Sequence, residues 1–372
     1  MERTRWILAD QLGDHFDDGG PMLLIESRGL LARRPYHRAK AHLILSGIRH
    51  RARALGDRVE FHQVEHYRDV VQDRRDLQVV DPTSRGLRRL VAEIEAEVLP
   101  SRGFVTSEQE FAEWMAGRTS NRLVMEDFYR WSRARTGILM DGDDPVGGRW
   151  NYDHDNRERP PKGAASLGLP GAVVAGGGRH RRRGARRPRR VGAEGPHAVR
   201  RGRTARAGSP SRRRRGASRS RTSWAAASTT SGPSRTRRSR GDWTMAHSLL
   251  SATMNMGVLD PADVVERIVA EHAAGRAPIQ SVEGIVRQIM GWRDYVWHLY
   301  WAFEDDYTSE NRLDAHRGVP TALRELDASG IQAACLSHVV DKVRTHGWAH
   351  HIERLMILGN LALQRGYDPR PP

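Results

Sequence analysis

Short apolar runs alternate with longer amphipathic stretches over the first 135 residues. The runs RWILADQL and PMLLIES and the alternating RVEFHQVEH are typical of β-strands. Apolar residues at helical spacing fill YHRAKAHLILSGIRHRARALG, which ends on Gly56, and SRGLRRLVAEIEAEVL. Because strands alternate with helices, we expect a parallel sheet covered by helices. The pattern therefore predicts a Rossmann-like α/β domain over residues 1–135.

From residue 241 onward the pattern predicts helices only. The stretches with helical spacing are MAHSLLSATMNMGVL, DPADVVERIVAEHAAG, SVEGIVRQIMGWRDYVWHLYWAF and THGWAHHIERLMILGNLALQRG. We expect an all-α domain over residues 241–372, preceded by a connection over residues 136–164. Between them, residues 165–240 show no periodicity and have too few apolar residues to form a core, which predicts an unstructured segment.

The positive charge of the chain is concentrated in that middle segment. The formal net charge is +16, with 61 Lys and Arg residues against 45 Asp and Glu residues. Residues 179–222 alone hold 18 Arg and one acidic residue, so the rest of the chain is close to neutral. The overall charge is therefore no argument that the folded parts bind nucleic acid. By composition, the Arg-rich segment fits either a disordered linker or a DNA-binding arm.

The single cysteine, Cys335, excludes a disulfide within the chain. The N-terminal MERTRWILADQLGDHF has no apolar run of signal-peptide length. No stretch contains the roughly 18 consecutive apolar residues of a membrane helix. We therefore expect a cytoplasmic protein that does not enter a membrane.

Two hydroxyl side chains lie close together at the start of the first predicted C-terminal helix. Ser248 and Ser251, together with the N–H groups of the helix start, suit the binding of a diphosphate. Serines in this position also act as ordinary N-caps, and this alternative stays open.

The third C-terminal helix combines aromatic, guanidinium and amide groups. Gln288, Trp292 and Arg293 lie within about a turn and a half of helix. An indole beside a guanidinium suits a stacked base and an anionic ring. Trp297 and Trp301 continue the aromatic series, and all these tryptophans equally suit a helical core.

Two adjacent histidines, His350 and His351, occur in the last predicted helix. Neighbouring side chains on a helix point about 100° apart, so this pair cannot chelate one metal ion. His346 and His350 are four residues apart, but no H-E-x-x-H frame accompanies them, and we expect no metal site. A histidine titrates near neutrality and can donate a proton, whereas a hydrogen-bonded core residue is the alternative.

Five motifs, in consistent order, resemble the photolyase/cryptochrome family. They are LADQL at residues 8–12, GGRWNYDHDNR at 147–157, HSLLSATMNMGVLDP at 247–261, SVEGIVRQIMGWRDYVWHLYW at 281–301 and HGWAHHIERLMILGN at 346–360. The last is similar to the paired-histidine helix of a bacterial branch that carries an iron–sulfur cluster and repairs (6-4) photoproducts. The resemblance covers about residues 4–165 and 241–368.

The resemblance implies light-driven DNA repair. In this family a reduced FAD in the all-α domain donates an electron to a pyrimidine dimer flipped out of the duplex. Matching flavin-contacting positions are His247, Ser248, Leu250, Ser251, Asn255, Gln288 and Arg293. Asp10, Glu26 and Tyr36 match positions near an antenna pocket, which in this branch holds a ribityl-lumazine. Trp292 and Arg287 match substrate-contacting positions, and one of His350 and His351 matches the proton donor.

The C-terminal end departs from that branch. Its members continue well beyond the GYDPRPP at which this sequence stops, and the further part supplies three of the four cysteines of a [4Fe–4S] cluster. Cys335 matches the first of them. Because the cluster needs four thiolates, we expect that this chain alone does not assemble it, and that its all-α domain is incomplete.

The Arg-rich segment has a third explanation. In the family this region is an ordered connection with acidic and aromatic residues. TTSGPSRTR, read one base earlier, allows DDFGPFEDA, and AVVAGG, read one base later, allows PWWPE. We therefore hypothesise that residues 165–240 are translated out of frame.

Several functions remain to be distinguished from the sequence. Repair of pyrimidine dimers, with the (6-4) lesion favoured, would make damaged DNA the partner. A local basic face of Arg287, Arg293 and Arg344 would then contact phosphates. The alternatives are a flavin-binding light sensor, an inactive truncated remnant and a nucleic-acid binder acting through the Arg run. No protein partner is indicated, and we expect a monomer.

Overall fold

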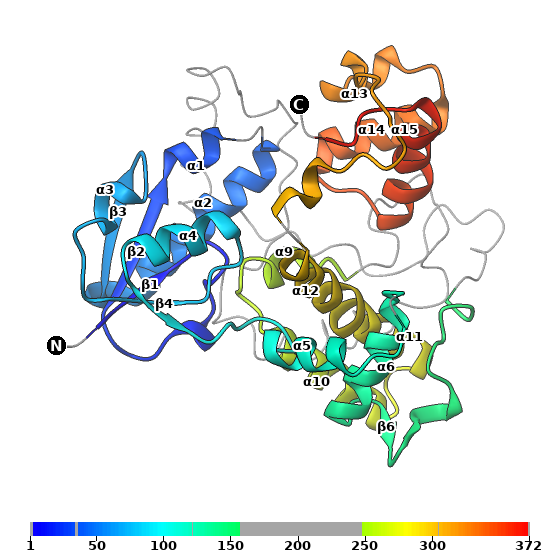
Figure 1. The fold of residues 1–372 in the computed structure, drawn as a ribbon, viewed down its shortest axis with the longest axis horizontal. Coiled ribbons are helices and arrows are strands. Elements are labelled where there is room, and N and C mark those ends of the chain that lie inside the picture. Colours follow the sequence, from blue (N-terminus) through cyan, green and yellow to red (C-terminus); the bar gives the residue numbers. More distant parts are fainter. Residues whose placement is uncertain (1–2, 34–35, 121, 157–247, 304, 371–372) are drawn as a thin grey trace. The chain divides into compact units, whose positions relative to one another are not determined.

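The computed structural model describes residues 3–33, 36–120, 122–156, 248–303 and 305–370 (Figure 1). These residues divide into two compact units. The first unit holds residues 3–100 and 305–370, and the second holds residues 101–156 and 248–303. The Arg-rich segment 165–240 lies outside the described residues, so its lack of structure and its out-of-frame origin stay predictions.

A five-stranded parallel sheet forms the centre of the first unit. Its strands lie in the order β3-β2-β1-β4-β5. They are β1 (Thr4–Ile7), β2 (Met22–Ser27), β3 (Val59–Val64), β4 (Leu77–Val80) and β5 (Glu97–Leu99). All six residues of β2 are buried, which means that both faces of the sheet are covered there. The predicted parallel α/β arrangement is confirmed.

Four helices connect the strands of this sheet (Figure 1). They are α1 (Arg28–Ala32), α2 (Arg38–Leu55), α3 (Arg68–Val71) and α4 (Arg85–Glu93). Helix α2 packs against β2 and β3, and it ends at Gly56 as the sequence predicts. Val71 of α3 and Val91 of α4 belong to one apolar cluster with Trp6 of β1. Apolar side chains of the helices and strands are thus buried between the helices and the sheet.

One predicted helix is shorter than its apolar pattern indicated. The stretch SRGLRRLVAEIEAEVL forms α4 only as far as Glu93, and its last part is β5. Glu95 adopts a positive φ of 56°, which ends the helix. The buried Ile94 continues the apolar spacing of α4, while Glu97 to Leu99 pairs with β4. The helical prediction for residues 94–99 is therefore wrong.

Helices are the main regular structure of the second unit (Figure 1). They are α5 (Glu108–Ala116), α6 (Met125–Thr136), α9 (Ser251–Met254), α10 (Pro261–Ala273), α11 (Ile279–Val286), the π-helix η5 (Arg287–Arg293) and α12 (Asp294–Ala302), beside a short hairpin of β6 (Met140–Asp141) and β7 (Asp144–Pro145). Phe111 of α5 and Phe128 of α6 share an apolar cluster with Val265 of α10 and Met290 of η5. Residues 101–136 thus pack with the later helices. The boundaries at residues 135, 164 and 240, at which we expect separate domains to meet, stay predictions.

The remaining helices, in residues 305–370, belong to the first unit. They are the 3-10 helices η6 (Asp305–Ser309) and η7 (Ala328–Gly330), α13 (Thr321–Arg324), α14 (Ala334–His346), the π-helix η8 (Glu353–Gly359) and α15 (Asn360–Arg365). The stretch THGWAHHIERLMILGNLALQRG is not one helix, because Gly347 has a φ of 66° and ends α14. A new helix begins at residue 351, so His346 lies at the end of α14 whereas His350 directly precedes the next helix. The all-α character predicted for the C-terminal region is confirmed. Within the described ranges, no helix combines the length and apolar character needed to cross a membrane.

Candidate functional site

A π-helical segment interrupts the long helix of the second unit. Helix α11, η5 and α12 run without a break from Ile279 to Ala302. Such wide turns are rare and often occur at functional sites. The four residues predicted from this helix, Arg287, Gln288, Trp292 and Arg293, all lie within η5. The structure therefore brings them together in one distorted stretch of helix.

Arg293 is held in a stack of planar groups. Its guanidinium carbon lies 4.2 Å from the centre of the Phe104 ring. The Phe104 ring lies nearly parallel to the Trp297 indole, with 4.2 Å between ring centres and 9° between planes. Arg293 Nη1 donates a hydrogen bond to the carbonyl of Gly103 at 2.6 Å, and burial lowers the pKa of Arg293. The neighbouring Trp292 is 46% exposed, so a partly buried cation lies beside an indole that can stack with a planar ligand.

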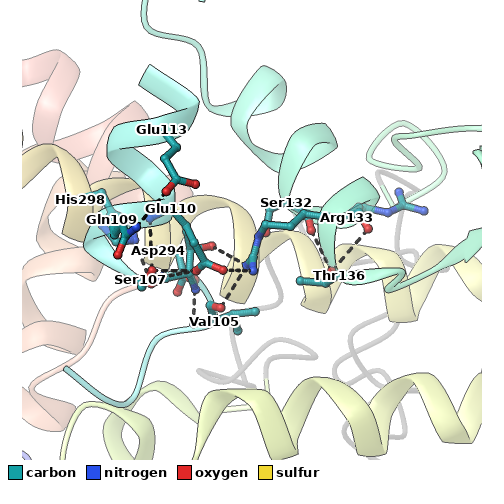
Figure 2. A network of polar contacts seen from close by, with 12 residues as sticks. Val105, Ser107, Gln109, Glu110, Glu113, Ser132, Arg133, Thr136, Asp294 and His298 are labelled. Atoms are coloured by element: carbon teal, nitrogen blue, oxygen red, sulfur yellow. Dashed lines mark hydrogen bonds and ion pairs between the residues drawn. The ribbon is translucent and has the colours of Figure 1, made fainter. Parts of the chain in front are cut away.

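Asp294 anchors the loop that carries Phe104 (Figure 2). Its Oδ2 accepts hydrogen bonds from the backbone N–H groups of Val105 and Thr106, each at 2.9 Å. Burial raises the pKa of Asp294 to about 7, although Arg293 and the two N–H groups act in the opposite direction. The enclosed carboxyl group thus joins the start of α12 to the loop before α5.

His298, one turn after Asp294, binds the same loop (Figure 2). Its Nε2 donates to the carbonyl of Thr106 at 3.1 Å, and burial lowers the pKa of His298 to about 4. On the other side of the loop, Ser107 and Glu110 form a reciprocal capping box at the start of α5. The loop that supports Arg293 is therefore held at Val105, Thr106 and Ser107, next to the start of α5.

Arg287, at the first turn of η5, is buried and engaged with acidic residues. Its Nη2 donates to Asp153 at 2.8 Å, and its Nε lies 3.2 Å from Glu283. Glu283 also accepts the N–H of Tyr152, and burial raises the pKa of Glu283. Arg287 thus ties the GGRWNYDHDNR stretch to the long helix. A contact of Arg287 with DNA stays a prediction that this buried position does not favour.

The residues predicted to hold a diphosphate surround the single turn of α9. Ser251 and Asn255 are exposed, whereas Ser248 and Leu250 are half-buried. Leu250 occupies the N-cap position, so neither serine is the N-cap residue of α9. His247 lies outside the described residues. Phosphate binding by this group stays a prediction.

The paired histidines lie in the first unit, at the start of its last helix. His350 is buried, His351 is half-buried, and their ring centres are 4.5 Å apart. Beside them, Lys342 and Glu353 form a buried ion pair at 2.8 Å. Within the predicted proton-donor pair, His350 is therefore enclosed by the protein, whereas His351 is partly accessible to solvent.

The three antenna residues lie in different environments. Asp10 follows β1, where the strand order reverses between β1 and β4, and ligands commonly bind parallel sheets at this position. It accepts a hydrogen bond from Thr83, and burial raises its pKa. Glu26 is buried with both oxygens bound by Arg49 at 2.7 Å, while Tyr36 is half-buried. Asp10 thus fits a ligand-facing role better than Glu26 does, and antenna binding stays a prediction.

Cys335 is exposed on α14. Among the described residues, no group of three or more His, Cys, Asp or Glu side chains is placed to hold a metal ion. The 372 residues contain one cysteine, and a [4Fe–4S] cluster needs four thiolates, so the residues present do not fit this group. Arg344, also on α14, donates to Asp341 and belongs to the first unit, whereas Arg287 and Arg293 belong to the second.

Known proteins resemble the chain in both sequence and structure. Residues 5–172 match the family model of deoxyribodipyrimidine photo-lyase-related protein. A (6-4) photolyase of Agrobacterium fabrum is 34% identical over 284 residues, which are 74% of this chain and 52% of that protein. An uncharacterized protein of Acanthamoeba polyphaga mimivirus is 28% identical over 94 residues, 23% of this chain and 48% of that protein. The chain thus spans about half the length of the curated relatives it matches.

A crystal structure of a bacterial class III photolyase from Agrobacterium tumefaciens superposes with a TM-score of 0.59. It covers 98% of this chain and 73% of that one at 13% identity, which shows the fold. An α/β sheet followed by helices is thus the architecture that this chain shares with a photolyase. The sequence matches and the shared fold thus agree with the resemblance to photolyases that the motifs predicted.

Sequence reasoning missed Asp294, His298 and Phe104. Asp294 and His298 are polar residues four apart in a helix that is otherwise largely apolar, and this spacing was the available signal. Phe104 gave no such signal, because its role depends on stacking with residues of a distant helix.

Proposed function

We propose that the chain binds FAD in its second unit and uses the reduced flavin in light-driven repair of (6-4) photoproducts in DNA. The observation that carries the proposal is the convergence of Gln288, Trp292 and Arg293 in the π-helical segment η5. The identity with a (6-4) photolyase supports the lesion class.

The donor groups present fit a flavin dinucleotide. The exposed Ser251 of α9 and Asn255, the C-cap of that helix, offer hydroxyl and amide donors to a diphosphate. Arg293 would place a partly desolvated cation beside an anionic ring. When bound, the reduced flavin would supply an electron to the lesion.

The protein's own residues would orient the reactants. Trp292 would stack with a base flipped from the duplex. The Phe104 loop, held by Asp294, would fix the plane of the Arg293 guanidinium. One member of the pair His350 and His351 would donate the proton, because imidazole exchanges protons near neutral pH.

Further parts of the proposal concern the antenna, the partner and the location. Asp10, at the reversal of strand order, would contact a ribityl-lumazine together with Tyr36.

Damaged DNA would be the partner of a monomeric, cytoplasmic protein. The lack of a membrane-spanning helix among the described residues is consistent with that location. The [4Fe–4S] cluster is left out of the proposal because the chain offers one thiolate.

Repair of a defined lesion tests the proposal. The full chain, reconstituted with FAD and a reductant, would be mixed with a duplex that contains one (6-4) photoproduct. We expect repaired bases under blue light and none in the dark. His351→Ala should abolish repair, while Asp341→Asn, an exposed residue of α14, should leave it unchanged. Flavin binding without repair would overturn the proposal and favour a light sensor.

A further inference from the structure

The last helix of the first unit begins with a histidine in place of a usual capping residue. Residues 351–365 are helical without a break, so His350 is the N-cap. Its Nδ1 accepts a hydrogen bond from the N–H of Ile352 at 3.1 Å, a bond that Ser or Asp side chains commonly accept. Because an amide N–H can only donate, Nδ1 carries no proton here. A neutral His350 ring therefore has its proton on Nε2.

A buried ion pair completes this cap. The Oε2 atom of Glu353 accepts the backbone N–H of His350 at 3.3 Å and the ammonium group of Lys342 at 2.8 Å. Both side chains are only 5% exposed. The His350 side chain thus accepts an N–H of the first helical turn, and the Glu353 side chain accepts the N–H of His350. This reciprocal arrangement resembles a capping box. Because an unpaired buried carboxylate is strongly disfavoured, the ion pair with Lys342 compensates for the burial of Glu353 in this position.

A second histidine in the same unit shows the same arrangement independently. Nδ1 of His37, at the start of α2, accepts the N–H of Ala39 at 3.1 Å. Its Nε2 lies 2.9 Å from the carbonyl of Arg344 and donates to it, since a carbonyl can only accept. In His37 both bonds therefore require the proton on Nε2. His350 has the first of these bonds with equal length.

We propose that the cap fixes His350 as the Nε2–H tautomer, and that Lys342 and Glu353 are positioning residues of the paired-histidine site. A proton added to His350 Nδ1 would break the bond from Ile352, so His350 exchanges its proton at Nε2. The use of this site in repair rests on the proposed function, whereas the tautomer does not.

Nitrogen NMR of the full chain tests the tautomer without flavin, lesion or light. The histidine rings would be labelled with ¹⁵N, and His350→Gln and His351→Gln would assign the two signals. We expect His350 at neutral pH to show a protonated Nε2 and an unprotonated Nδ1. A protonated Nδ1 would overturn the proposal. Because no repair is measured, this result is separate from success or failure of the proposed function.

Two neutral double variants test the positioning role. Lys342→Met with Glu353→Gln keeps an oxygen for the His350 N–H, whereas Lys342→Met with Glu353→Leu removes it. We expect the Gln variant to retain the single tautomer and the Leu variant to show a mixture. In the reconstituted enzyme the Leu variant should also lower the repair rate about tenfold with unchanged affinity for the lesion. Asp341→Asn, on the same helix, is the control.

An unchanged tautomer in the Leu variant would overturn the role of Glu353. The wild-type spectrum decides the tautomer regardless of how the variants fold.

Discussion

At the scale of single residues, Asp294 and His298 show how burial against one segment shifts two pKa values in opposite directions. Both side chains bind the loop at Val105 and Thr106, and burial acts on both. Burial disfavours whichever form is charged, so it raises the pKa of the carboxyl group to about 7 and lowers that of the imidazole to about 4. The two groups should therefore make opposite contributions to stability in the same pH range.

The pH dependence of unfolding tests this opposition. Asp294, with an ordinary value of 3.8, stays protonated in the folded chain while it ionises in the unfolded chain, so its contribution falls as pH rises from 4 towards 7. His298, with an ordinary value of 6.5, binds a proton only in the unfolded chain between pH 4 and 6.5, so its contribution rises with pH. Each slope is at most about 1.4 kcal/mol per pH unit.

We therefore expect the free energy of unfolding of Asp294→Asn to rise with pH across this range, relative to the wild type. The free energy of unfolding of His298→Gln should fall with pH relative to the wild type. Urea unfolding at a series of pH values measures both, and parallel slopes in the two variants would contradict the assignment.

Arg287 makes a second residue-scale prediction. Arg287→Met leaves the buried Glu283 without its cation, which should reduce the free energy of unfolding by about 3–5 kcal/mol. Adding Glu283→Gln should restore most of this loss, since the buried charge is then gone. Arg276→Met is the control, because the Arg276 guanidinium that pairs with Glu271 is largely exposed and its loss should change stability much less. Equal losses for Arg287→Met and Arg276→Met would argue against a buried pair.

At the scale of elements, helix ends decide where the functional residues lie. Gly347 and Gly366 both end helices with a φ of 66°. A Cβ on Gly347 would lie 2.6 Å from Nδ1 of His37, whereas one on Gly366 would lie 3.9 Å from its nearest neighbour. Glycine is therefore required at position 347 both by the left-handed turn and by the close approach of His37, whereas at position 366 it is required by the turn only.

The two glycines form a matched pair for mutation. Gly366→Ala should reduce the free energy of unfolding by about 1 kcal/mol through backbone strain alone. Gly347→Ala should lose roughly 1–3 kcal/mol more, because the new methyl group collides with the His37 cap of α2. Urea unfolding of both variants measures the difference. Equal losses would show that the approach of His37 adds nothing.

Elements were predictable from the sequence where the pattern is local. The β1, β2 and β3 runs and the ends of α2 and α10 follow from apolar spacing and from Gly56, Asp260 and Pro261. Residues 94–99 were misassigned, because strand β5 depends on pairing with β4 and on the positive φ of Glu95. The π-helical character of η5 left no mark in the periodicity, although its residues were singled out correctly as one group.

At the scale of the whole molecule, the fold class was predictable and the grouping of segments was not. The α/β and all-α patterns are properties of each stretch of sequence. The packing of Phe111 and Phe128 with Val265 and Met290 joins stretches more than 130 residues apart, and no local pattern encodes it. The aromatic stack of Phe104 with Arg293 has the same long-range origin. The candidate site was therefore found from its helix and completed only by the structure.

Flavin binding tests the central claim most directly. The full chain would be titrated with FAD, and quenching of flavin fluorescence would give the stoichiometry and Kd. We predict one FAD per chain. Arg293→Gln should weaken binding about tenfold or more, which corresponds to about 1.4 kcal/mol, while Arg312→Gln, an exposed residue of the first unit, should leave Kd unchanged. A chain that folds but binds no FAD, or that binds it equally well without Arg293, would contradict the account.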